Sequence, residues 1–134
     1  MKNVSLSSHQ ELEDRVKELT AELVDNHEFI WKLRENPVYL EADGWKRFEE
    51  VINKIYKNYT QRLKDDFSFL TEVDIQLCIL LKLQFNNTQI ASITAVSISS
   101  VSVQKSRLKR RLLQTDPHLF DDNNRTLDSF LLEY

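Results

Sequence analysis

The sequence LTEVDIQLCILLKLQFNNTQIASITAVSISSVSVQKSRLKRRL, from Leu70 to Leu112, decides the fold of this chain. Three segments with apolar residues at helical spacing are separated by two short polar breaks, near Asn86 and Ser97. Such polar side chains accept hydrogen bonds from the first unpaired N–H groups of a helix. The pattern therefore predicts three helices joined as a helix-turn-helix.

Each of these helices has a recognisable start. Thr71-x-x-Asp74 resembles a capping box, and the helix that follows to about Leu83 is apolar nearly all round, which predicts burial on more than one side. Asn86-x-x-Gln89 caps a second helix that runs to about Thr94. Ser97 is the predicted N-cap of a third helix, from Ile98 to about Leu113.

The third predicted helix has two faces of different chemistry. At 100° per residue, one side gathers Val101, Gln104, Leu108 and Leu112, which we expect to point inward. The opposite side gathers Ser99, Ser102, Val103, Ser106 and Arg110, with Lys105, Arg107 and Lys109 on its flanks. An outward face of small residues with basic edges suits a helix lying in the major groove of DNA.

Charge is distributed unevenly along the chain, although the formal net charge is −3. Between Ile75 and Thr115 there is no Asp or Glu, whereas this region contains Lys82, Lys105, Arg107, Lys109, Arg110 and Arg111. A local positive patch on an acidic protein can bind phosphate groups. The alternative is an ordinary solvated helix face.

The first part of the chain has a heptad pattern. Between residues 7 and 35, apolar residues follow a 4-3 spacing with one polar interruption, which predicts a helix that forms a homodimeric coiled coil. The predicted seam consists of Leu12, Val16, Leu19, Leu23, Asn26, Ile30 and Leu33. An amphipathic helix folding back on its own chain is the alternative. Asn36-Pro37 ends the helix, because the residue before proline is disfavoured in the α region.

The segment between these two regions is rich in aromatic residues at helical spacing. Asp43 is the expected N-cap of a helix to about Tyr56, and a continuation covers residues 60–67. We interpret this segment as a packing adaptor. A short last helix is expected from about Arg125 to Leu132. Because the chain has only 1 Gly and 2 Pro, the whole fold is predicted to be all-α, with a coiled coil at 1–36, adaptor helices at 37–68 and a DNA-binding domain at 69–134.

Leu70 to Leu112 resembles the LuxR-type helix-turn-helix family of bacterial transcription regulators. The resemblance lies in Leu70-Thr71-Glu72, in Asn87-x-x-Ile90-Ala91, in Ser97 with Ser100-Val101, and in the basic run that ends at Leu112. That run is closest to Bacteroidetes-type members, in which an aromatic-rich helix precedes the motif and a coiled coil often links it to a membrane span and a sensor. The family usually has Gly where Gln84 stands, and Asn86 and Asn87 nearby tolerate left-handed geometry.

The resemblance implies a division of roles on DNA. Ser102, Val103 and Ser106 would face base edges, although Ser102 replaces a Lys that is common in the family. The residues implied at phosphates are Thr88, Gln89, Ser99, Lys105, Arg107, Lys109 and Arg110. Replacing Arg110 with Ala should then weaken binding to all sequences, whereas replacing Val103 with Ala should change the preference among them.

No pattern in the sequence indicates an enzyme, a cofactor, a metal ion or a small-molecule site. His9, His27 and His118 lack ligand spacing, the one Cys is Cys78, and the sole glycine, Gly44, excludes a Gly-rich phosphate loop. No apolar run has the length of a bilayer span, so we expect a cytoplasmic chain or the cytoplasmic part of a membrane-anchored protein. Two further alternatives are a coiled-coil protein-interaction module and a sigma-factor-like promoter-binding domain, which would also bind RNA polymerase.

Overall fold

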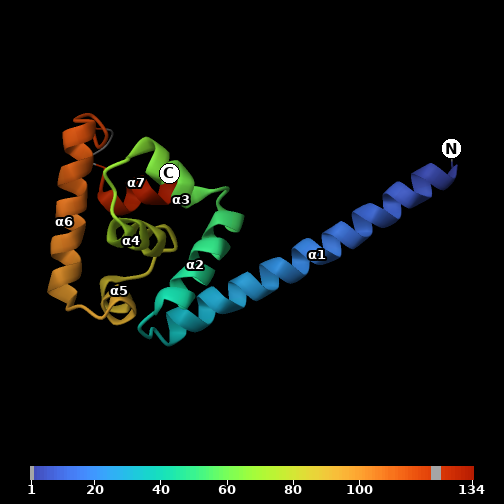
Figure 1. Ribbon diagram of the computed structural model, residues 1–134, viewed down its shortest axis with the longest axis horizontal. Coiled ribbons are helices and arrows are strands. Elements are labelled where there is room, and N and C mark those ends of the chain that lie inside the picture. Colours follow the sequence, from blue (N-terminus) through green and yellow to red (C-terminus); the bar gives the residue numbers. More distant parts are fainter. Residues whose placement is uncertain (1, 122–124) are drawn as a thin grey trace. The chain divides into compact units, whose positions relative to one another are not determined.

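The computed structural model describes residues 2–121 and 125–134, with side chains described for residues 8–19, 28–121 and 125–134. The helices are α1 (Lys2–Glu35), α2 (Ala42–Ile55), α3 (Tyr59–Asp66), α4 (Glu72–Lys82), α5 (Asn87–Thr94), α6 (Ile98–Thr115) and α7 (Leu127–Glu133) (Figure 1). No strand occurs within the described ranges, which confirms the all-α prediction. The chain divides into two compact parts, Met1–Asn36 and Pro37–Tyr134, and the second is called the head below.

α1 is one uninterrupted helix of 34 residues, about 51 Å long at 1.5 Å per residue. Leu12, Val16 and Leu19 of the predicted seam are 64%, 60% and 42% exposed, whereas Ile30 and Leu33 are buried. The side chains of Leu23 and Asn26 lie outside the described residues. None of the described helices is both long and apolar enough to cross a lipid bilayer.

α4 is the centre of the head. Nearly every side chain from Ile75 to Leu81 is buried, with Gln76 the exception. The helix contacts α2, α3 and α7, while α5 and α6 pack on each other. This arrangement explains why the sequence of α4 is apolar all round and confirms its predicted burial on more than one side.

The aromatic residues of α2 and α3 belong to the same core as α4. Phe48, Ile52 and Tyr59 are fully buried, and the Tyr59 hydroxyl donates to the Cys78 carbonyl at 3.2 Å. Burial is also the main reason that the pKa of this phenol is raised. The predicted adaptor therefore shares one hydrophobic core with the helices that follow it.

Two predicted helix starts are wrong. α2 begins at Ala42 with Glu41 in the N-cap position, so Asp43 lies inside the first turn, where a carboxylate still interacts favourably with the helix dipole. α7 begins at Leu127 rather than near Arg125. Its start is fixed by Thr126 and Ser129, whose side chains each accept a hydrogen bond from the other residue's backbone N–H.

The other predicted caps are confirmed. The Thr71 hydroxyl accepts from the Asp74 N–H at 3.2 Å, and the Asp74 carboxylate accepts from the Thr71 N–H at 2.9 Å. Asn86 and Gln89 form the same reciprocal pair at 2.8 and 2.9 Å. These local bonds fix where α4 and α5 begin.

Gln84 carries the left-handed backbone of the turn after α4. Its φ is 63°, its N–H donates to the Leu81 carbonyl, and the Phe85 N–H donates to the Leu80 carbonyl, both at 3.0 Å. This pattern is a Schellman motif, whose left-handed position is usually glycine. The expectation that Asn86 or Asn87 would take this geometry is wrong, because Asn86 has φ −81° as the N-cap of α5 and Asn87 lies within that helix.

Replacing Gln84 with Gly is expected to raise the free energy of unfolding by about 0.5–1 kcal/mol. A residue with a Cβ costs about 1–2 kcal/mol in the left-handed conformation, and glycine removes this cost. Part of the gain is lost, because glycine has more conformational entropy in the unfolded chain. Urea denaturation followed by circular dichroism measures the change. Gln84→Ala is the matched control and should give no gain, since it keeps the Cβ. An unchanged or lower midpoint for Gln84→Gly would show that the turn is not strained.

Candidate nucleic-acid interface

α5 and α6 form a helix-turn-helix with a short, well-defined turn. Ala95 ends α5 in the left-handed region at φ 55°, and the Val96 N–H donates to the Ala91 carbonyl at 3.1 Å. The Ser97 hydroxyl then accepts from the Ser100 N–H at 3.1 Å and starts α6, as predicted. The two helices pack on each other, and each carries apolar side chains that are fully buried. They are Ile90, Ile93, Val101 and Leu108.

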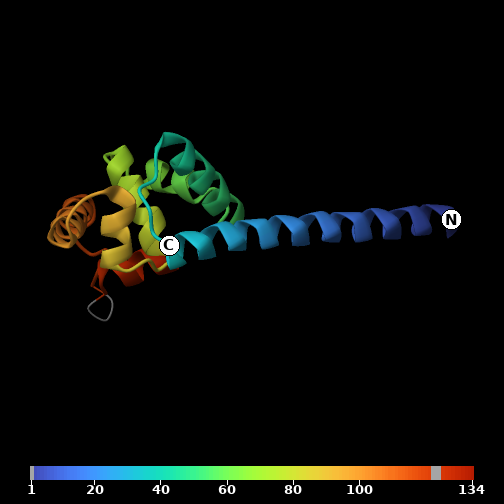
Figure 2. The same ribbon diagram turned by 90° about the horizontal axis from the view of Figure 1, so that it is seen from below.

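The two predicted faces of α6 are confirmed by burial. Val101 and Leu108 are fully buried, Leu112 is 2% exposed, and Gln104 is half-buried. The residues of the opposite face, all of them exposed, are Ser99, Ser102, Val103, Ser106 and Arg110. Both ribbon views place α6 along an edge of the head (Figures 1 and 2), and the exposure of these five residues shows that the outward face is open to solvent in the single chain.

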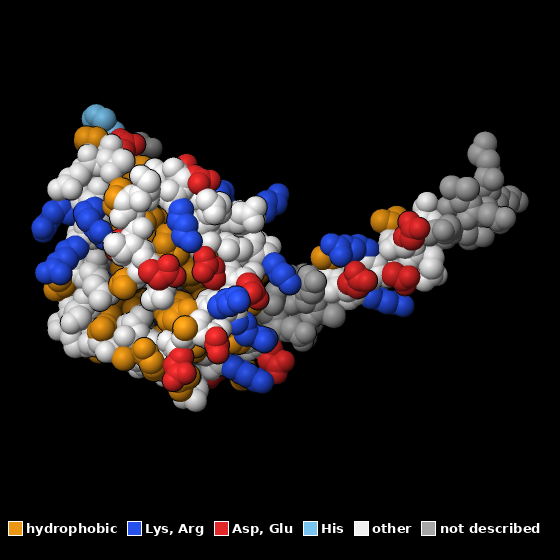
Figure 3. Space-filling model, in the orientation of Figure 1, with side chains coloured by type: hydrophobic (Ala, Val, Ile, Leu, Met, Phe, Trp, Pro, Cys, Tyr) orange, Lys and Arg blue, Asp and Glu red, His pale blue; other side chains and the backbone are white. Residues whose placement is uncertain are grey.

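The outward face carries two shallow, open depressions between its side chains. One shallow depression is lined by Ser102, Val103, Ser106, Arg107 and Arg110. A second depression, nearer the start of α6, shares Val103 and Arg107 and includes Ser99. The surface view shows Lys and Arg side chains along the α6 edge of the head (Figure 3). The structure thus brings most of the predicted α6 residues together, whereas Thr88 and Gln89 of α5 line neither depression.

Only some of the basic side chains on α6 lack an interaction partner within the described residues. Arg107 and Arg110 are exposed, and their side chains make no hydrogen bond or ion pair within the described residues. Lys109 lies over the Phe120 ring, 5.1 Å from its centre. Arg111 forms an ion pair with Asp74 of α4 and lies over Phe69.

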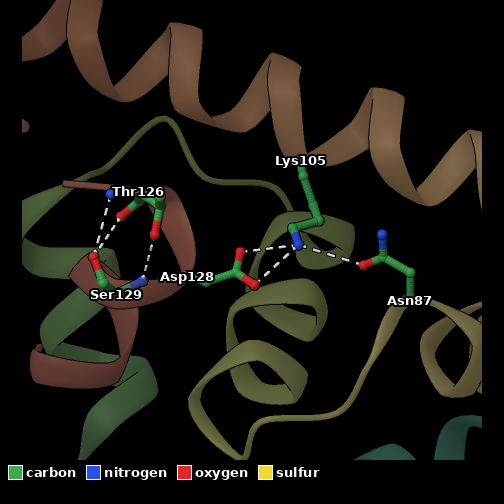
Figure 4. A network of polar contacts seen from close by, with 5 residues as sticks. All are labelled: Asn87, Lys105, Thr126, Asp128 and Ser129. Carbon is green, nitrogen blue, oxygen red and sulfur yellow. Dashed lines mark hydrogen bonds and ion pairs between the residues drawn. The ribbon is translucent and has the colours of Figure 1, made fainter. Parts of the chain in front are cut away.

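Lys105 joins three helices of the head. Its ammonium lies 2.9 and 3.0 Å from the two carboxylate oxygens of Asp128 on α7, and it donates to the Asn87 side chain on α5 at 3.4 Å (Figure 4). Its side chain is only 20% exposed. Lys105 was predicted to contact phosphate, but its ammonium is already paired. We therefore treat it as a structural residue.

Two other positive or polar residues are also used inside the head. Lys82 is buried with its ammonium over the Tyr56 ring and bonded to the Leu132 carbonyl, and burial, together with nearby Arg62, lowers its pKa. It therefore adds nothing to the α6 face. The Gln89 side chain accepts from the Asn86 N–H at 2.9 Å, while Thr88 is exposed on the first turn of α5.

Sequence reasoning missed the acidic partners of the basic run. Asp74 and Asp128 lie 37 and 23 residues from the Arg111 and Lys105 side chains that they bind. No local pattern could have identified them. Within the described residues, no cluster of three His, Cys, Asp or Glu side chains could hold a metal ion.

Comparisons of the chain with protein-family models, with curated proteins and with solved structures find no match. The resemblance to LuxR-type regulators therefore rests on the motif residues of this sequence alone.

Proposed function

We propose that the head binds double-stranded DNA through the outward face of α6 and that the chain is a helix-turn-helix transcription regulator resembling the LuxR type. One observation carries this proposal: a single exposed face of α6 combines short side chains with the guanidinium groups of Arg107 and Arg110, which have no partner in the described part of the chain. The same stretch of sequence, from Ile75 to Thr115, contains no acidic residue. A face with this chemistry suits a groove walled by phosphates.

In the proposed complex α6 lies in the major groove, which is wide enough to admit an α-helix. Ser102, Val103 and Ser106 face the base edges, where Val103 can contact the methyl group of a thymine. Thr88, Ser99 and Lys109 are placed at phosphates, which set the register of the protein on the duplex. Gln89 is left out of these contacts, because its side chain accepts from the Asn86 N–H and caps α5.

The exposed apolar residues of α1 support a second part of the proposal, a homodimer. Leu12, Val16 and Leu19 form a solvent-exposed stripe in the single chain, and a dimeric coiled coil would bury it. Two heads would then bind half-sites about one helical turn apart, with added avidity. Sedimentation equilibrium tests this part alone. A monomer at high concentration would remove the dimer and leave the DNA-binding head in place.

The proposed function is tested by binding the purified chain to random-sequence duplex DNA at several salt concentrations. The logarithm of the binding constant should fall linearly with the logarithm of salt, by about 0.9 per phosphate contact. The chain should also be retained on heparin despite its sequence pI of about 5.6. No binding to duplex at low salt would refute the proposal and favour the protein-interaction module.

A further inference from the structure

We infer that Arg110 reads a guanine base in the major groove instead of contacting a phosphate, and that it sets the sequence preference of the head together with Val103. The inference rests on the proposed DNA-binding function and names the base that the α6 face selects. It departs from the family resemblance, which assigns Arg110 to the phosphate backbone.

Arg110 has the freedom that such a contact needs. Among the basic residues from Lys105 to Arg111, only Arg107 and Arg110 have no hydrogen bond, ion pair or ring contact with another side chain in the described part of the chain. A base contact needs a guanidinium group that can leave solvent without breaking an internal bond. Both arginines meet this condition.

The angular position on α6 separates these two arginines. At 100° per residue, Arg110 projects about 40° from Ser106 and about 20° from Val103, between the two, at the middle of the outward face. Arg107 projects about 40° beyond Val103, toward the edge of the face. The middle of the face meets the floor of the groove, and a long charged side chain toward an edge reaches the phosphate walls. Arg110 therefore meets bases, and Arg107 meets the backbone. Ser102 lies about 80° from Arg110 on the other side of the face, so its short side chain is at the margin of the strip that faces the bases.

The direction of helical side chains brings Arg110 onto the depression. Long side chains on a helix lean toward its N-terminus, over the residue four positions earlier. For Arg110 that residue is Ser106, whose short side chain leaves room, and both line the same depression as Ser102 and Val103. The guanidinium of Arg110 thus extends over the strip that is proposed to face the base edges.

The chemistry of the side chain selects guanine. A planar guanidinium donates two parallel hydrogen bonds, and among the bases only guanine presents two adjacent acceptors, O6 and N7, in the major groove. Lysine can also donate to O6 and N7, so the contact is tested by removing the donors altogether, as in Arg110→Ala. Loss of a phosphate contact in the same variant would weaken binding without changing the response to a guanine that lacks N7.

The experiment begins with selection of bound duplexes from a random library by the full chain. Each guanine of the enriched site is then replaced by 7-deazaguanine, which pairs normally but lacks the N7 acceptor. At one guanine of the site, this replacement should lower wild-type affinity about tenfold, as expected for loss of one of the two hydrogen bonds from the guanidinium. The Arg110→Ala variant should bind both duplexes equally. Arg107→Ala, the matched control, should bind more weakly but respond to the replacement as the wild type does.

The outcomes separate the inference from the function on which it rests. Arg110→Ala that keeps the full 7-deazaguanine response, or Arg107→Ala that loses it as Arg110→Ala does, overturns the inference while DNA binding stands. A library from which no duplex is enriched overturns the proposed function and the inference together. Both arginines are exposed, so neither substitution removes a core contact.

Discussion

Replacing Arg107, Lys109 and Arg110 together with alanine is expected to lower the affinity for duplex DNA at least about a hundredfold, because a hydrogen bond to a charged group contributes about 1.5–3 kcal/mol. The salt dependence should weaken as well, by up to about 0.9 in the logarithmic slope for each of these residues that neutralises a phosphate. Titration of a labelled duplex at several salt concentrations measures both quantities. Lys105 is left unchanged in this variant, because its loss would break the contact between α6 and α7.

A control with the same change in net charge is available on α2 and in the turn that follows it. Lys46, Lys54 and Lys57 are exposed, and the ribbon views place α2 and α6 on different sides of α4 (Figures 1 and 2). Replacing these three lysines with alanine should change the affinity only slightly, through the long-range field of the protein. Equal losses in the two variants would indicate a general charge effect. Unchanged binding in the α6 variant would refute the proposed interface.

The parts of the fold that were predicted correctly depend on local sequence. The reciprocal caps join Thr71 with Asp74 and Asn86 with Gln89, residues only three positions apart. In each pair the two side chains accept hydrogen bonds from N–H groups that have no partner within the helix, so the local pattern is enough to predict where the helix begins. The buried face of α6 follows from the spacing of Val101 and Leu108. The sequence contains all the information that these features need.

The parts that were not predicted depend on contacts between distant segments. The sequence shows that Lys105 and Arg111 are basic, but it does not show that Asp128 and Asp74 already bind them. The composition of the candidate site was therefore predictable, whereas the subset of its cations that remains unpaired was not.

Replacing Leu108 with alanine is expected to lower the free energy of unfolding by about 2–5 kcal/mol. Leu108 is fully buried on the inward face of α6, so the smaller side chain leaves a cavity in the core. Because small domains are stable by only about 5–15 kcal/mol, a loss of this size should lower the urea midpoint clearly. Circular dichroism during urea denaturation measures this loss. DNA binding should decrease only in proportion to the fraction of the chain that is unfolded.

Val103 provides the control on the same helix. It is 47% exposed on the outward face, so Val103→Ala should change stability by no more than about 0.5 kcal/mol, as is usual for surface positions. Under the proposed function the same variant should change the preference among DNA sequences, because it removes the side chain assigned to a thymine methyl. The two variants thus separate a face that stabilises the head from a face that contacts DNA. A loss of stability in Val103→Ala as large as that in Leu108→Ala would place both faces in the core, and a helix buried on both sides has no surface left to enter a groove.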